Sequence, residues 1–229
     1  MDYNVSNSTR RKVIIFGLEQ TSQLAHYYLD VDSPHEVVAF SVHEKYMDKE
    51  RFCGLPVIPF EKIEKDHSPS EFKFLVPLYA TKMNTIREKV YLEIKEKGYS
   101  FVNYISSKAY TWNCDIGENC MVLEGSNLQP FSKVGNNVII WSKNHIGHHS
   151  VIEDNCYITG LVAVSGNVTV GKNSFLGGNC TIRDGIKLAE GTFIAMDASV
   201  QRAIEEPWGV YKGTPARVVK GVSSMKINL

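Results

Sequence analysis

The sequence predicts a small α/β domain followed by a parallel β-helix, and three observations lead to this prediction. Apolar runs alternate with helical patterns over residues 12–107. In the second half of the chain, an aliphatic residue occupies every sixth position without an insertion. A small residue follows most of these positions four residues later. A period of six fits neither an α-helix nor a simple hairpin sheet, and it is typical of a parallel β-helix.

The α/β domain is predicted over residues 12–107, after a disordered tail at 1–11. Residues 12–16 form an apolar run before Gly17, which indicates a buried parallel strand. Further strands are expected at 36–42, 72–78 and 101–105, with helices at 18–29 and 81–97. The second helix would be capped by Thr81 and would bury one face, which consists of Met83, Ile86, Val90 and Ile94. This alternation predicts a Rossmann-like sheet.

The turn after the first strand limits what this domain can bind. It reads Gly-Leu-Glu-Gln-Thr-Ser from Gly17, which lacks the GxGxxG pattern of a dinucleotide site. Two interpretations remain open. The turn makes no phosphate contact, or it forms a looser substrate site from Gly17, Glu19 and Gln20 together with His43 after the second strand. Such sheets bind ligands beyond the carboxyl ends of their strands.

The hexad repeat defines the second domain, predicted at residues 108–206, with a C-terminal extension at 207–229. Each hexad is expected to supply one short strand and one turn, and three hexads would close one coil. The aliphatic side chains point into the core. They are Ile116, Val122, Leu128, Val134, Ile140, Ile146, Ile152, Ile158, Val164, Val170, Leu176, Ile182, Leu188, Ile194 and Val200.

Two further hexad positions have a predicted structural role. The small residues are expected to fill tight interior corners; they are Cys120, Ser126, Ser132, Ser150, Cys156, Ser174, Cys180, Thr192 and Ala198. Glycine often follows the aliphatic residue directly, where we expect it to supply backbone conformations that other residues reach only at a cost. These glycines are Gly117, Gly135, Gly147, Gly171 and Gly177.

Composition excludes several classes of function. The formal net charge is zero and the chain shows no basic stripe, so nucleic acid is not an expected partner. No apolar run approaches the length of a membrane span, and the N-terminus lacks the apolar region of a signal peptide. Five cysteines occur without a CxxC pair, which favours core packing over metal ligation or disulfides. A cytoplasmic protein fits these features.

The junction Asn103-Tyr-Ile-Ser-Ser-Lys-Ala and the segment Gly213-Thr-Pro-Ala-Arg217 carry a resemblance to a known family. With the hexads, they make the chain similar to bacterial acetyltransferases that modify nucleotide-linked amino sugars, and to their sialic acid O-acetyltransferase relatives. The resemblance implies a left-handed β-helix and a homotrimer. It also implies that acetyl-CoA lies between neighbouring β-helices, that the N-terminal domain helps to hold the sugar, and that no metal takes part.

Three of the seven histidines fall within the segment 145–149. Attack of an amine or hydroxyl on a thioester needs a base that accepts a proton near neutral pH, and histidine suits this role. In the family, the catalytic histidine precedes an x-x-V-I-G-D segment, and His148-His-Ser-Val-Ile-Glu-Asp154 aligns with it, so His148 takes that position. His145 and His149 are alternative bases or substrate contacts, or simply solvated surface residues. An acidic neighbour is common in the family, but here Gly147 and His149 flank His148.

The resemblance also implies positions that bind acetyl-CoA. Tyr157 occupies a position near the thioester, where it could donate a hydrogen bond. Glycines on a groove wall would let the pantetheine approach the backbone, and one N–H could support the oxyanion. Lys212 and Arg217 would contact the phosphates. The expected acetyl-CoA residues are Tyr157, Gly166, Gly177, Gly178, Lys212 and Arg217.

The sequence therefore favours an acetyl-CoA-dependent acetyltransferase acting on an amino group of a nucleotide-linked amino sugar, in the synthesis of a surface glycan. O-acetylation of a sugar or sialic acid is the enzymatic alternative, and another acyl donor stays open. A β-helix that serves only as an assembly scaffold is the non-enzymatic alternative. Zinc chemistry fits poorly, because His145, His148 and His149 are too close in sequence to form a three-histidine site unaided.

Overall fold

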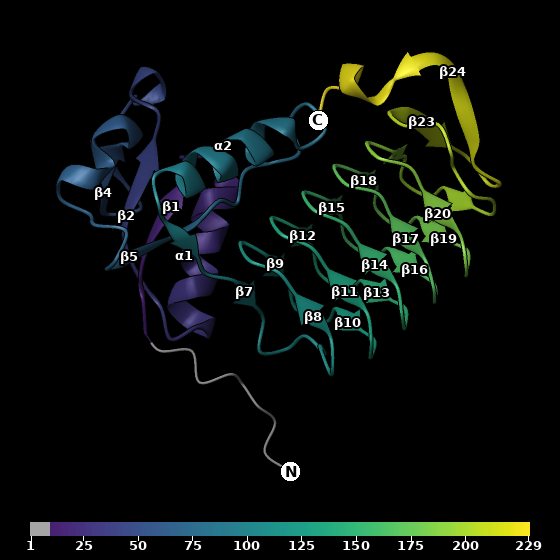
Figure 1. Cartoon of the computed structure of the whole chain (residues 1–229), viewed down its shortest axis with the longest axis horizontal. Coiled ribbons are helices and arrows are strands. Elements are labelled where there is room, and N and C mark those ends of the chain that lie inside the picture. Colours follow the sequence, from purple (N-terminus) through teal and green to yellow (C-terminus); the bar gives the residue numbers. More distant parts are fainter. Residues whose placement is uncertain (1–9) are drawn as a thin grey trace. The chain divides into compact units, whose positions relative to one another are not determined.

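In a computed structural model, which describes residues 10–229, the chain divides into two compact units (Figure 1). The first unit contains the described residues up to Leu78 together with Leu92–Tyr104, and the second contains Tyr79–Tyr91 and Ile105–Leu229. The segment 79–91 thus belongs with the repeat, although the sequence placed it in the α/β domain. Most of the predicted tail, residues 1–9, lies outside the described residues. Arg10 forms an ion pair with Glu36 at 3.0 Å.

The first unit contains a six-stranded sheet in the order β3-β4-β2-β1-β5-β6. Its pairs are parallel except for β3 and β4, which are antiparallel. The strands are β1 (Lys12–Phe16), β2 (Glu36–Val42), β3 (Arg51–Phe52), β4 (Leu55–Pro59), β5 (Phe72–Leu75) and β6 (Ser100–Phe101). The helical segments are α1 (Gln20–Asp32), η1 (Glu44–Tyr46), η2 (Phe60–Lys65) and α2 (Thr85–Glu96), and the first part of α2 belongs to the second unit.

Two details of this unit differ from the sequence prediction. Strands β3 and β4 were missed, because β4 contains two prolines, which argue against a strand. The predicted strand 101–105 is divided between β6 and a separate strand, β7 (Tyr104–Ile105), which joins a sheet of the β-helix. The alternation of strands and helices was predicted correctly, and the Rossmann-like classification stays a prediction.

The second unit is a parallel β-helix with one two-residue strand per hexad. The strands are β8 (Asp115–Ile116), β9 (Met121–Val122), β10 (Asn127–Leu128), β11 (Lys133–Val134), β12 (Ile139–Ile140), β13 (His145–Ile146), β14 (Val151–Ile152), β15 (Tyr157–Ile158), β16 (Ala163–Val164), β17 (Thr169–Val170), β18 (Phe175–Leu176), β19 (Thr181–Ile182), β20 (Lys187–Leu188), β21 (Phe193–Ile194) and β22 (Ser199–Val200). At the C-terminus, β23 (Gly209–Lys212) and β24 (Arg217–Ser223) extend the stack and η3 (Ser224–Lys226) follows.

The strands form three faces. Face 1 is the sheet β24-β23-β21-β18-β15-β12-β9-β7, face 2 is β10-β13-β16-β19-β22, and face 3 is β20-β17-β14-β11-β8. Neighbouring strands within the repeat lie one coil apart, so His145 pairs with Ala163 and Ile146 with Val164. These parallel stacks fit the β-helix that the sequence predicted.

The turns between faces stack into three edges. Edge 1, between faces 3 and 1, consists of turns 117–120, 135–138, 153–156, 171–174 and 189–192. Edge 2, between faces 1 and 2, consists of turns 123–126, 141–144, 159–162, 177–180 and 195–198. Edge 3, between faces 2 and 3, consists of turns 129–132, 147–150, 165–168 and 183–186. A residue therefore shares an edge with the residue 18 positions later.

The core of the β-helix confirms the hexad prediction. Each of the aliphatic hexad positions is buried except Ile116 in the first coil, which is partly buried. The predicted small positions are buried as well. Burial raises the pKa of the Cys120, Cys156 and Cys180 thiols to about 12, so these thiols are protonated at neutral pH. The cysteines act as core residues, as predicted.

The prediction that the repeated glycines supply unusual backbone conformations is wrong. Gly147 and Gly177 do not adopt positive φ; a side-chain carbon at Gly147 would lie 2.4 Å from the backbone of Ser165. Glycine is needed there because the next coil passes too closely for a Cβ atom. The left-handed residue of each turn lies two positions later. These residues are Asn119, Gly125, Phe131, Asn137, Lys143, His149, Asn155, Leu161, Asn167, Asn173, Asn179, Gly185, Gly191 and Asp197.

Edge 1 carries a buried ladder of asparagine side chains. The Nδ2 group of each asparagine donates to Oδ1 of the next, from Asn119 to Asn137 (2.7 Å), Asn155 (2.8 Å) and Asn173 (3.2 Å). The last one, Asn173, donates to Glu88 at 2.7 Å. The ladder satisfies side-chain amides that would otherwise be buried without partners.

Arg87 is fully buried against this ladder. Its guanidinium donates to the carbonyl and side-chain oxygens of Asn137, to the carbonyl of Asn155 at 2.9 Å and to Asn84 Oδ1 at 2.8 Å. Asn84 in turn donates to the carbonyl of Asn173 at 3.1 Å. Burial lowers the pKa of Arg87 to about 10, so the group is still charged at pH 7. Arg87 fixes the segment 79–91 to edge 1.

The start of α2 differs from the prediction for the same reason. The helix begins at Thr85, not at Thr81, because Lys82, Met83 and Asn84 all have positive φ. This left-handed turn buries Met83 and directs Asn84 to the ladder. Ile86, predicted to be buried, is 41 % exposed, whereas Val90 and Ile94 are buried as predicted. In α1 the buried residues are Ser22, Ala25 and Leu29.

Replacing Gly171 with alanine should lower the free energy of unfolding by about 1–3 kcal/mol, because the new Cβ would overpack the coil above. That carbon would lie 2.7 Å from the backbone of Ala189. Gly178→Ala is the matched control, since its nearest neighbour would be 3.6 Å away. Urea denaturation of both variants measures the difference, and equal stabilities would contradict the steric explanation.

Replacing Arg87 with methionine should lower the free energy of unfolding by about 3 kcal/mol, because it leaves several buried oxygens without donors. Arg183→Met is the control: Arg183 is exposed and has one long hydrogen bond, of 3.4 Å, so its loss should change the stability by no more than about 0.5 kcal/mol. Chemical denaturation compares the two. An Arg87→Met variant as stable as its control would show that Arg87 does not anchor the segment.

Candidate active site

His148 lies on edge 3, in the turn between β13 and β14, and its side chain is exposed. Its backbone N–H donates to Gln129 Oε1 at 3.0 Å, one coil earlier. Its Nδ1 lies 3.1 Å from Nδ1 of His149, and the two rings pack edge to face at 5.3 Å. His149 is the left-handed residue of the turn and packs on Phe131 at 4.9 Å. Both the backbone and the ring of His148 are therefore held in place.

The contact between the two imidazoles determines where a proton can be accepted. One of the two Nδ1 atoms must donate to the other when both rings are neutral. If His148 carries its proton on Nδ1, His149 accepts that bond and Nε2 of His148 has a free lone pair. In that tautomer Nε2 can act as a general base. In the same tautomer, the contact with His149 holds the His148 ring in place.

Gly166 and Asp184 lie on edge 3 in the next two coils, at the same turn position as His148. A side-chain carbon at Gly166 would lie 2.8 Å from His148 Nε2 and 3.0 Å from Asp184 Oδ2. The absence of a side chain at Gly166 therefore allows the imidazole and the carboxylate to lie close to its backbone. No acceptor within residues 10–229 takes the Gly166 N–H. This N–H can support a developing oxyanion, as the sequence predicted for a glycine on a groove wall.

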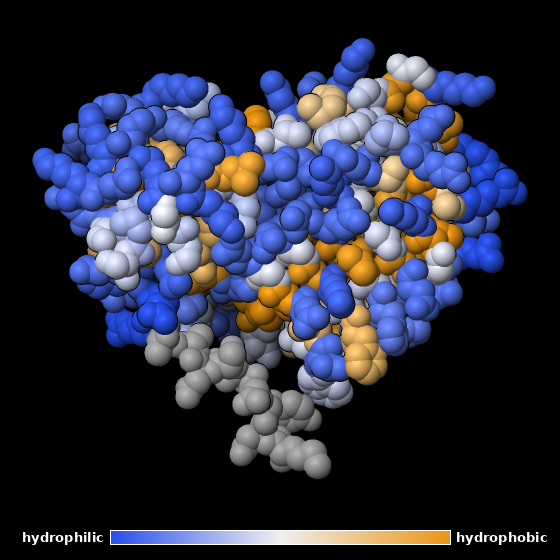
Figure 2. Space-filling model, viewed as in Figure 1, coloured by the Kyte–Doolittle hydropathy of each residue, from blue (hydrophilic) through white to orange (hydrophobic). Residues whose placement is uncertain are grey.

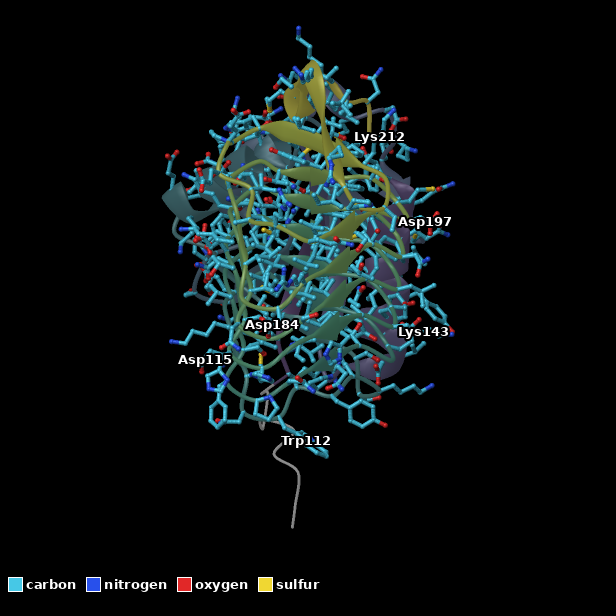
Figure 3. All side chains as sticks on the ribbon, turned by 90° about the vertical axis from the view of Figure 1, so that its right-hand side faces the viewer. Trp112, Asp115, Lys143, Asp184, Asp197 and Lys212 are labelled. Atoms are coloured by element: carbon cyan, nitrogen blue, oxygen red, sulfur yellow. The ribbon has the colours of Figure 1, made fainter. Side chains whose placement is uncertain are left out.

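Asp184 was missed by the sequence analysis, which looked for a carboxylate among the sequence neighbours of His148. The repeat itself carries the signal, because residues 18 positions apart share an edge. Two such steps lead from His148 through Gly166 to Asp184. Figure 3 shows Asp184 on the same side of the β-helix as Asp115, and Lys143, Asp197 and Lys212 on the opposite side.

The remaining predicted acetyl-CoA residues lie on a different edge. Gly177 and Gly178 belong to edge 2, in the turn between β18 and β19. Lys212 is the last residue of β23 and pairs with Arg217 of β24. Strand β23 pairs with β21 of face 1, with Tyr211 opposite Ile194, which directly precedes an edge 2 turn. Both cations therefore lie at the edge 2 end of face 1. Both cations are exposed. One chain therefore does not bring these residues together with His148 and Gly166.

Tyr157 does not face a groove, contrary to the prediction. Its side chain is fully buried on face 1, where its ring contacts Tyr79 at 5.1 Å and stacks on Phe175 at 5.8 Å. The guanidinium of Arg87 lies 5.9 Å from the ring centroid. The segment 79–91, which the sequence assigned to the other domain, covers this position and leaves Tyr157 no surface for acetyl-CoA.

His145 lies in strand β13 of face 2, next to Asn127 and Ala163. Its side chain is half-buried and points away from the core, as strand alternation predicted. The outward row of this face contains small or polar residues, namely Asn127, His145, Ala163, Thr181 and Ser199. Face 2 joins edge 2 to edge 3, so it separates the two groups of predicted residues.

The predicted substrate residues of the first unit lie at the carboxyl ends of β1 and β2. Gly17 is buried with φ of 114°, and its N–H donates to the carbonyl of Ser41 at 2.8 Å. Glu19 and Gln20 are exposed at the start of α1. Within the described residues, the buried Oγ1 of Thr21 and Oγ of Ser22 have no hydrogen-bond partner. A helix start with free donors is suited to an anion.

His43 lies in a shallow pocket of about 460 Å³ that Gly17, Glu19 and Gln20 do not line. The lining residues are His43, Phe60, Glu61, Glu93, Glu96 and Lys97. His43 Nε2 is 2.8 Å from Glu93 Oε2. Because its lining contains three carboxylates and one lysine, the pocket disfavours binding of a phosphate and favours binding of hydroxyl or amino groups. The structure thus separates the predicted substrate residues into an anion-suited turn and an acidic pocket.

Two searches of residues 10–229 bear on other classes of site. They contain no cluster of three or more histidine, cysteine or acidic side chains arranged to hold a metal ion. None of the helices in this part of the chain has the length and apolar character needed to cross a membrane.

Comparison with known proteins identifies the repeat and the fold. A family model described as the hexapeptide repeat of succinyl-transferase matches residues 167–201. Comparison with curated protein sequences gave no match. The acetyltransferase domain of PglB from Neisseria gonorrhoeae, in complex with acetyl coenzyme A, superposes with a TM-score of 0.81 at 18% identity over 92% of this chain and 100% of that chain. PerB from Caulobacter crescentus, in complex with CoA and GDP-perosamine, gives a TM-score of 0.80 at 21% identity over 90% and 96%.

A more distant structure, WeeI from Acinetobacter baumannii, gives a TM-score of 0.62 at 15% identity over 91% of this chain and 100% of that chain. At these identities the similarity shows a shared fold. The chain therefore contains a hexapeptide repeat and has the fold of solved sugar acetyltransferases of the left-handed β-helix type.

Proposed function

We propose that the chain is an acetyl-CoA-dependent acetyltransferase that acylates an amino group of a nucleotide-linked amino sugar used in surface glycan synthesis. The observation that carries this proposal is the arrangement on edge 3. His148 Nε2 lies close to the backbone of Gly166, whose N–H has no acceptor in the described chain. PerB, which shares the fold, is described in complex with CoA and GDP-perosamine.

The residues on edge 3 can serve the two needs of acyl transfer. His148 Nε2 accepts the proton that the acceptor nitrogen loses as it attacks the thioester carbonyl. The Gly166 N–H donates to the carbonyl oxygen as negative charge develops there. His149 holds the His148 ring through the Nδ1 contact of 3.1 Å. An amine needs less help from the base than a hydroxyl, because it can attack first and lose its proton later.

The division of residues between edges 2 and 3 favours a site formed by two chains. Face 2 separates these edges and presents an outward row of small or polar side chains. When a second copy packs beside it in a closed ring, edge 3 of one chain can meet edge 2 of the next. His148 and Gly166 would then face Gly177, Gly178, Lys212 and Arg217 of the neighbour. A homotrimer provides this arrangement three times.

The surface of the β-helix agrees with this assembly. Figure 2 shows apolar side chains exposed over the repeat among polar ones. Phe131 on edge 3 and Leu161 and Met196 on edge 2 are among the large apolar residues that are more than half exposed. A contact between edge 3 and edge 2 of neighbouring chains would bury them. In the first unit, the start of α1 is suited to the phosphates of a nucleotide, with Gly17 beside it.

Replacing His148 with alanine should lower kcat/KM by about 10²- to 10⁴-fold, the usual contribution of a general base. The measurement is thiol release from acetyl-CoA with a panel of UDP-, dTDP- and GDP-linked amino sugars. His35→Ala is the control, because His35 belongs to the first unit and should leave turnover unchanged. Unchanged turnover by His148→Ala would show that His148 is not the base. Bound acetyl-CoA without turnover on any amine would favour a hydroxyl acceptor instead.

Two inactive variants should restore activity when they are mixed, if the site lies between chains. His148→Ala removes the base on edge 3, and Gly178→Leu fills the groove on edge 2, where no atom lies within 3.6 Å of a new Cβ. After unfolding and reassembly of an equal mixture, about one quarter of the sites should combine two intact edges. The wild type treated in the same way is the control. A mixture as inactive as its parents would place the site within one chain.

A further inference from the structure

Asp184 and His148 lie beside each other on edge 3 without contacting each other. His148 Nε2 and Asp184 Oδ2 lie 2.8 Å and 3.0 Å from the position that a Cβ of Gly166 would take, so the two atoms are less than about 6 Å apart. Among the described residues, His148 bonds through its N–H to Gln129, through its ring to His149 and through its carbonyl to Asn167, and not to Asp184. One donor group on the solvent side of the two side chains can therefore reach both atoms.

The carboxylate of Asp184 is available for such a group. Asp184 is exposed, and within residues 10–229 its side chain has no ion pair or hydrogen bond. The neighbouring cation, Arg183, directs its guanidinium to the carbonyl of Gln201 at 3.4 Å. Next to it on edge 3, Gly185 has no side chain to cover the carboxylate.

We infer that Asp184 binds the acceptor as an ammonium group beside His148 and thereby selects an amine over a hydroxyl. This inference rests on the proposed acetyltransferase function and names its acceptor chemistry. A carboxylate attracts an ammonium group through charge and a charge-assisted hydrogen bond, whereas a neutral hydroxyl gains only an ordinary hydrogen bond. Most amino sugars are protonated near neutral pH, so a site that captures the ammonium form collects the abundant species.

The protons of this reaction balance as follows. The bound ammonium releases one proton to solvent and becomes the attacking amine. Its nitrogen forms the C–N bond to the thioester carbonyl carbon while the C–S bond breaks. His148 Nε2 takes the second proton from this nitrogen and passes it to the leaving thiolate, which leaves as the thiol. The carboxylate of Asp184 also stabilises the imidazolium that forms transiently.

The test is Asp184→Asn, which removes the charge and keeps the shape, measured with the amino-sugar acceptor that the wild type turns over. KM for this acceptor should rise about tenfold, the value of one charge-assisted hydrogen bond. Binding of the analogue with a hydroxyl in place of the amine should change less than twofold. Asp184→Glu should recover part of the loss. Asp115→Asn is the control, since Asp115 is an exposed carboxylate on the same side of the β-helix (Figure 3).

The outcomes separate this inference from the function on which it rests. If the wild type releases thiol with an amine and Asp184→Asn behaves like Asp115→Asn, the inference is overturned and the function stands. The same holds if Asp184→Asn weakens the amine and the hydroxyl analogue equally. If the wild type acylates a hydroxyl and no amine, the amine acceptor of the proposed function and this inference both fail. If the wild type shows no acyl transfer to any acceptor, the proposed function fails, and the inference fails with it.

Discussion

The stacking of each turn on the turn one coil earlier is the constraint from which the rest of the β-helix follows. Backbone bonds such as Gly147 N to Val164 O hold neighbouring coils in register. Each turn then needs one left-handed residue, and the next coil passes so close to the residue after the strand that several of these positions admit only glycine. Side chains at equal turn positions form columns. The neighbours of a residue on an edge are thus fixed by the repeat and not by its adjacent residues.

On edge 1, the register of the coils also positions the groups that bind Arg87. The asparagine ladder exists because left-handed turn residues recur there, and asparagine tolerates this conformation better than most residues. The ladder and its carbonyls then offer acceptors to a buried guanidinium. The left-handed turn at Lys82, Met83 and Asn84 costs about 1–2 kcal/mol per residue. The hydrogen bonds of Asn84 and Arg87 offset this cost and explain why the turn precedes α2.

The repeat was predictable from the sequence because each coil imposes the same demands in the same order. The buried aliphatic and small positions follow from the period alone. The role of glycine was not predictable, because two different causes select glycine. One is a backbone with positive φ, and the other is a neighbouring coil that leaves no room for a Cβ atom. Phe131, Lys143 and Leu161 made the left-handed position hard to recognise, because these residue types rarely adopt it. Tyr157 was misplaced because its cover comes from residues 79–91, which no local pattern links to face 1.

The position of His148 was found from its local sequence, but its surroundings come from the columns of edge 3. Gln129, Gly166 and Asp184 lie one or two coils away; Gln129 accepts the His148 N–H, His149 contacts the His148 ring, and Asp184 places a carboxylate near Nε2. The proposed base therefore has a carboxylate nearby without an acidic sequence neighbour. The fold also limits which residues one chain can bring together, because a β-helix cannot bend to bring edge 2 to edge 3 across face 2. The two halves of the proposed site can meet only when the edges belong to different chains.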